Sequence, residues 1–148
     1  MSPPFFIIII TIIQISLFIY YDQLAKKQQE TLTSLLIKSP FIFDPSKRHQ
    51  LWRYISYALV HIDWIHLTCN ISIQIIIGLP LELNHKYRIV IVYLLGCLSG
   101  SLCSYLIDYN RILLGSSAAV CAIVFAFFAY CCFVSIYFIS IHGNSQEK

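Results

Sequence analysis

Polar or small residues recur every four positions within an otherwise apolar stretch of the chain, as His66, Asn70, Gln74, Gly78 and Glu82. Residues at this spacing lie on one face of a helix. The imidazole of His66 and the amide of Asn70 therefore lie one turn apart on that face. Polar groups inside a membrane span are costly and mark candidate functional sites, although a hydrogen-bonded ladder between helices would place them there as well.

A candidate nucleophile stands further along the chain, in the sequence Gly115-Ser116-Ser117. A serine hydroxyl attacks a carbonyl carbon when a neighbouring base removes its proton. On its own this motif is a weak signal, because a serine in an apolar helix usually donates to a carbonyl of its own helix.

The composition indicates the environment in which these polar residues lie. Of the 148 residues, 58% are hydrophobic and only 11% are charged, whereas a soluble domain carries about 25% charged residues. The chain is therefore expected to lie in a lipid bilayer. The net charge of +3 is spread along the chain, so nucleic acid is not an expected partner. The six cysteines form no C-x-x-C pair, and neither a metal site nor a cofactor is expected.

Four segments are long and apolar enough to cross a bilayer as helices. They span residues about 5–21, 65–83, 87–107 and 112–140, and a polar loop over 22–61 holds six of the ten lysines and arginines. Residues 1–148 would then form a single membrane domain. Two crossings separate the starts of the second and fourth segments, so both starts lie on the same side of the membrane. His66, Asn70 and Ser117 are therefore expected at comparable depth.

Small residues predict close contacts between these segments. Gly96 and Gly100 form a Gly-x-x-x-Gly motif in the third segment, and Gly115, Ala119 and Ala122 follow in the fourth. Such positions let the backbones of two helices approach each other.

The order of these motifs resembles the rhomboid family of intramembrane serine proteases, and especially its animal rhomboid-related branch. The match runs over about residues 4–123 and includes Trp52-Arg53, His61, His66, Asn70, Gly78-x-x-x-Glu82, Tyr93-x-x-Gly96, Gly100 and Gly115-Ser116-Ser117. This resemblance implies an all-α membrane fold, a polytopic helical bundle with about four transmembrane helices of an incomplete rhomboid-like core. It also implies a secretory-pathway or plasma membrane.

The resemblance assigns roles to individual residues. Ser117 would be the nucleophile, and His66 and Asn70 would stabilise the oxyanion. The partners would be transmembrane protein substrates and the lipid bilayer. Structural roles would fall to Trp52, Arg53, His61, Gly78, Glu82, Gly96, Gly100 and Gly115.

Three features depart from the family pattern. Rhomboids use a histidine roughly fifty residues beyond the serine as the general base, whereas 31 residues follow Ser117 here. His142 would lie about 37 Å along the same helix, too far away to serve. Ala118 replaces a usual glycine and is expected to crowd the oxyanion site, and Cys121 replaces a common tyrosine. The sequence therefore predicts a truncated, inactive chain.

Three functions remain open at this point: an incomplete rhomboid protease, a non-catalytic rhomboid-like protein that binds transmembrane clients, and a purely structural bundle. The orientation rests on the family, whose N-terminus is cytosolic and whose active site opens to the lumen or exterior. The positive-inside rule favours the reverse, because the first loop and Arg111 hold seven lysines and arginines against three on the opposite side.

Overall fold

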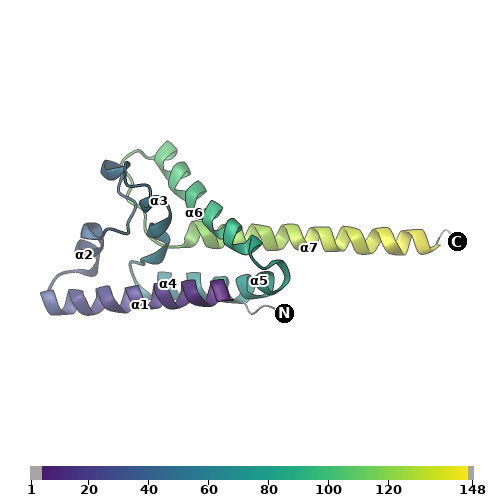
Figure 1. Ribbon diagram of the computed structural model, residues 1–148, viewed down its shortest axis with the longest axis horizontal. Coiled ribbons are helices and arrows are strands. Elements are labelled where there is room, and N and C mark those ends of the chain that lie inside the picture. The colour runs from purple at the N-terminus through teal and green to yellow at the C-terminus, as the bar shows by residue number, and fades with distance from the viewer. Residues whose placement is uncertain (1–4, 147–148) are drawn as a thin grey trace.

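Four helices in the computed structural model are long and apolar enough to cross a membrane (Figure 1). The structure describes residues 5–146 and the side chains of residues 5–140. The first span is α1, Phe5–Gln28. The second joins α4 (Trp64–Ile73), a π-helical turn η3 (Gln74–Gly78) and α5 (Leu79–His85). The third and fourth are α6, Arg88–Ile107, and α7, Ser117–Gln146. The expected helical membrane bundle is confirmed.

The π turn in the second span accounts for the stripe of residues spaced by four. In a straight α-helix this spacing drifts slowly around the axis, because a turn holds 3.6 residues. A π turn holds more residues and reverses part of that drift. Asn70, Gln74, Gly78 and Glu82 are accordingly all buried, and His66 is half-buried. The stripe faces protein, as the sequence predicts.

The first loop is more ordered than its polar composition suggests. It contains α2 (Leu32–Lys38), η1 (Pro45–Lys47), α3 (Arg53–Ser56) and η2 (Tyr57–Leu59). The buried guanidinium of Arg53 donates to the carbonyl oxygens of Ser39 at 3.1 Å and Ile42 at 2.8 Å. Trp52 is 56% exposed, and its indole donates to the carbonyl oxygen of Pro40 at 3.2 Å.

Two predicted boundaries differ from the structure. α1 continues past residue 21 until Gln29, whose φ of 55° ends the helix. The fourth helix begins at Ser117 rather than at residue 112. The segment before it is extended, since Leu113 forms an isolated antiparallel bridge with Phe43. Apolar composition alone does not distinguish such an extended segment from the first turn of a helix.

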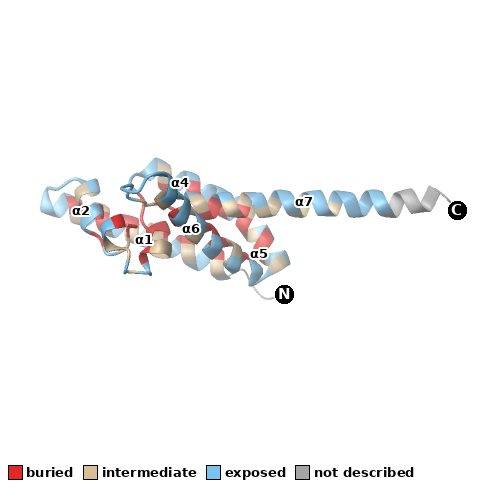
Figure 2. Ribbon diagram, turned by 90° about the horizontal axis from the view of Figure 1, so that it is seen from above, coloured by how far each residue is buried: buried red, intermediate tan, exposed pale blue. Residues whose placement is uncertain are grey.

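Small residues bring α6 and α7 together where the two helices cross (Figure 1). A methyl group placed on Gly96 would lie 2.7 Å from the Ala122 Cβ, and one on Gly100 would collide with the Ala118 methyl. The side chain of Ala118 therefore packs against α6. Beyond this crossing, the far part of α7 is exposed and extends past the turn between α5 and α6 (Figure 2).

Candidate functional site

Ser117 is the first residue of α7, and its side chain is exposed. The two residues before it are buried, and Gly115 has a φ of +97°. The ring of His66 packs against Gly115 so closely that a methyl group there would lie 2.9 Å from the imidazole Nε2. The fold thus brings the start of the second span against the loop that precedes Ser117.

The start of α4 sets the position of His66. Asp63 caps this helix, and its Oδ1 accepts a hydrogen bond of 2.7 Å from the backbone N–H of His66. Aspartate is a favoured N-cap because its carboxylate satisfies an otherwise unpaired amide. One turn later, the Nδ2 of Asn70 donates to the carbonyl oxygen of His66 at 2.9 Å. The two side chains therefore lie on consecutive turns of one face.

His61 contacts the serine that the sequence motif did not single out. Its Nε2 lies 3.2 Å from the hydroxyl oxygen of Ser116 and accepts from the Ser116 backbone N–H at 3.4 Å. The ring also meets His66 edge to face, with centroids 5.3 Å apart. Because 55 residues separate His61 from Ser116, no local pattern could have revealed this contact.

Burial and the neighbouring His66 ring lower the pKa of His61 from 6.5 to about 4. A neutral ring also fits its contacts, because Nε2 must be unprotonated to accept from a backbone N–H. Its Nδ1 has no hydrogen-bond partner within the part of the chain that the structure describes. His61 therefore acts as a neutral hydrogen-bond acceptor for the segment that precedes Ser117. This segment, residues 113–116, is called the serine loop below.

This burial predicts that stability falls in mild acid. Between pH 6.5 and about 4, the unfolded chain binds a proton at His61 that the folded chain does not. The free energy of unfolding should therefore decrease as the pH falls through this window, and the contribution of His61 is complete above it. Denaturant unfolding in detergent micelles at pH 7.5, 6.0 and 4.5 would measure the slope. His61→Asn should reduce this dependence of the free energy of unfolding on pH. The variant His49→Asn, at an exposed position, should keep it. Equal slopes in the parent and in His61→Asn would contradict the assignment of the acid sensitivity to His61.

Two backbone contacts also hold the serine loop. Phe43 and Leu113 exchange N–H to carbonyl hydrogen bonds, each of 3.1 Å. The N–H of Gly115 donates to the carbonyl oxygen of Tyr57 at 2.9 Å. The first loop is thus a scaffold for the residues that precede Ser117.

The middle of the stripe belongs to a hydrogen-bond network between helices. The Nε2 of Gln74 donates to the Thr11 hydroxyl at 2.8 Å and to the Gln14 side chain at 3.2 Å. Gln14 in turn donates to the carbonyl oxygen of Ala58 at 3.0 Å and to the Tyr93 hydroxyl at 3.1 Å. The ladder interpretation therefore holds for Gln74. Thr11 and Gln14 are polar residues in an apolar span, a sequence signal that could have predicted this network.

Glu82 ends the stripe and anchors α1. Its carboxylate oxygens accept from the backbone N–H groups of Phe6 at 2.8 Å and Ile7 at 2.9 Å. These amides lie in the first turn of α1, where no partner exists within the helix and negative charge is favourable. Gly78, one turn earlier, lets Ile7 approach, because a Cβ at that glycine would lie 3.0 Å from the Ile7 Cδ1.

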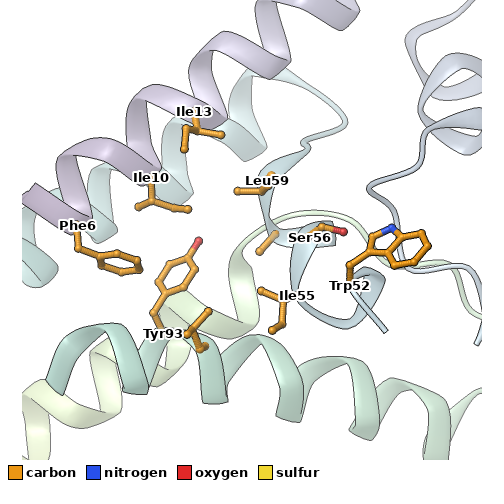
Figure 3. A pocket seen from close by; sticks show the side chains of 10 residues that line it. Phe6, Ile10, Ile13, Trp52, Ile55, Ser56, Leu59 and Tyr93 are labelled. Atoms are coloured by element: carbon orange, nitrogen blue, oxygen red, sulfur yellow. The ribbon is translucent and has the colours of Figure 1, made fainter. Parts of the chain in front are cut away.

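An apolar cavity of about 420 Å³ lies between α1, the α3–η2 segment and α6 (Figure 3). Phe6, Ile10 and Ile13 line one side, and Ile55 and Tyr93 point toward them. Neither Ser117 nor the His66–Asn70 pair lines this cavity. Among the described residues, no three histidine, cysteine, aspartate or glutamate side chains gather closely enough to hold a metal ion.

A base for Ser117 is not found among the side chains of residues 5–140. His61 contacts Ser116, and His66 packs on Gly115. α7 is continuous from Ser117 to Gln146, so it carries the backbone of His142 far from the serine. The side chain of His142 lies outside the described residues.

Comparisons with known proteins agree with the motif order. A family profile described as Rhomboid domain matches residues 48–144. The chain is 42% identical to Rhomboid-related protein 2 of Mus musculus over 130 residues, which cover 86% of this chain and 43% of that protein. It is 40% identical to Rhomboid-related protein 1 of Caenorhabditis elegans over 134 residues, or 84% of this chain and 37% of that protein.

A third relative carries a different functional description. The chain is 35% identical to Inactive rhomboid-related protein 2 of Caenorhabditis elegans over 116 residues, which cover 78% of this chain and 33% of that protein. The chain thus spans less than half the length of these relatives.

Proposed function

Because this chain belongs to the rhomboid family, we propose that it carries the nucleophile and the oxyanion site of an intramembrane serine endopeptidase. The observation that carries the proposal is the packing of the His66 ring on Gly115, two residues before Ser117. The substrates would be transmembrane segments of other proteins in a secretory-pathway or plasma membrane. The chain itself is an integral, multi-pass membrane protein.

The positions of three side chains support the proposed chemistry. The Oγ of Ser117 would attack the scissile carbonyl carbon while a base takes its proton, and the carbonyl oxygen would become an oxyanion. His66 and Asn70 would donate hydrogen bonds to that oxyanion in a site of low dielectric constant. The C–N bond would then break, the amine would leave with a proton, and water would hydrolyse the acyl-enzyme. The donation from Asn70 to its own helix would be exchanged for one to the oxyanion.

The general base of this scheme must come from outside the described side chains. A family histidine on a later helix would supply it, since Ser117 is exposed, whereas His61 is buried and contacts Ser116. His61 acts differently here: it would fix the backbone of the loop and support the ring of His66.

A second candidate function is the binding of transmembrane clients without cleavage. It is favoured by the absence of a histidine against Ser117 among residues 5–140 and by the similarity to a relative described as inactive. The same helix faces would then hold a client segment without turnover.

The 148-residue polypeptide is expected to release no Ser117-dependent product from a transmembrane substrate. A serine without a base is a weak nucleophile at neutral pH. The measurement uses the purified polypeptide in detergent with a labelled transmembrane substrate, and gel analysis of the products. Ser117→Ala is the matched control. Cleavage that this substitution abolishes would contradict the expectation and point to a base among the described residues.

A further inference from the structure

The turn between α5 and α6 presents a cluster of basic side chains. Lys86 and Arg88 are exposed, and neither makes an ion pair among the described residues. His85 stands beside them at the end of α5. The carboxylate of Glu82 lies one turn away, but the amides of α1 occupy it. The positive charge of this turn is therefore not neutralised by a neighbouring acidic group.

An apolar cavity of about 300 Å³ opens beside this turn. Three helices contribute to it: Leu81 from α5, Val92 from α6, and Ala126 and Phe133 from α7. Tyr130 of α7 and His85 also line this cavity, and their rings pack edge to face with centroids 5.0 Å apart. The residues from α5 and α6 lie toward the interior of their spans, so the cavity extends from the turn into the membrane.

A second cavity, of about 250 Å³, lies over the turn itself and is lined by Asn84, His85, Lys86, Tyr87 and Arg88. His85 and Arg88 line both cavities, so the basic surface and the apolar groove adjoin. Tyr87 is 69% exposed. Exposed tyrosines and lysines at the ends of spans are typical of the level of the lipid headgroups.

We propose that this turn and groove form a binding site for one anionic phospholipid. The phosphate and the anionic headgroup would lie against Lys86 and Arg88, and one acyl chain would lie in the groove between α5, α6 and α7. An anionic phospholipid fits both halves of the site, because it carries a net negative charge next to its hydrocarbon chains. Uncompensated positive charge selects the anionic class over zwitterionic lipids.

The test measures lipid retained by the purified protein. The detergent-solubilised chain would be titrated with dioleoylphosphatidylserine or dioleoylphosphatidylcholine, and the bound lipid counted by native mass spectrometry. The parent chain should prefer phosphatidylserine. The double variant Lys86→Gln/Arg88→Gln should weaken phosphatidylserine binding about tenfold or more, since each basic residue near the membrane surface contributes substantially to anionic lipid attraction. Its affinity for phosphatidylcholine should change little.

Two further variants separate this site from a general charge effect. Lys27→Gln/Arg111→Gln removes the same charge from exposed positions elsewhere and should leave phosphatidylserine binding intact. Ala126→Phe fills the groove while keeping every charge and should weaken the binding of both lipids. Circular dichroism would verify that each variant remains helical. Equal losses in the two double variants, or no loss in Ala126→Phe, would overturn the proposal. Displacement of the lipid by millimolar inorganic phosphate would also overturn it, because a bare anion site would then suffice.

Discussion

Replacing Ser117 by alanine is expected to abolish proteolysis in a chimera that restores the rest of a rhomboid. In this chimera the chain would replace the matched region of mouse Rhomboid-related protein 2. Removal of the nucleophile from a serine protease lowers the rate by several orders of magnitude, so a loss of at least about 1000-fold is expected. Cleavage of a labelled transmembrane substrate in proteoliposomes measures it.

The adjacent serine provides a matched control for this experiment. Ser116 is buried and its hydroxyl contacts His61, so Ser116→Ala removes one loop contact but no reacting atom. That variant should keep most of the cleavage activity. The reverse result, with loss in Ser116→Ala and retention in Ser117→Ala, would exclude Ser117 as the nucleophile. A chimera that cleaves nothing while binding the substrate would favour the client-binding function.

The spacing of residue types along the chain predicts much of this fold, because a helix brings residues three or four positions apart onto the same face. The spacing of Asn70, Gln74 and Glu82 indicates a face buried against protein, and the structure buries all three. Gly96 and Gly100 indicate a close helix crossing, which α6 and α7 make. Both inferences need only a repeat length and the cost of placing polar groups in lipid.

Contacts between distant parts of the chain are what the sequence could not predict. Glu82 binds amides 75 and 76 residues away, and His61 meets a serine 55 residues away. Hydropathy also fails where an apolar segment is extended, as at Leu113, because its bridge to Phe43 depends on the folded first loop. The methyl group of Ala118, the residue that follows the predicted nucleophile, packs against Gly100 of α6. Which element that methyl group meets depends on how α6 and α7 pack, and the packing is a long-range property of the fold.

Gly115→Ala is expected to damage both the fold and the site. The φ of +97° at Gly115 is strained for any residue with a Cβ, at a cost of roughly 1–3 kcal/mol in the free energy of unfolding. The added methyl group would also collide with the ring of His66. A displacement of about 1 Å at a reacting centre lowers rates about 100-fold, so the chimera should lose cleavage by at least that factor.

Gly78→Ala is the matched control for this substitution, because Gly78 has helical backbone angles and its new methyl group would lie 3.0 Å from the Ile7 Cδ1 and at ordinary contact distance from Ile123. It should cost less stability and leave the cleavage rate of the chimera nearly unchanged. A double variant with His66→Ala separates strain from collision. If the new methyl group collides with the His66 ring, removing the ring should relieve part of the strain. The double variant should then lose less stability than the sum of the losses in Gly115→Ala and His66→Ala. Additive losses, together with a parental cleavage rate in Gly115→Ala, would mean that His66 does not depend on the serine loop for its position.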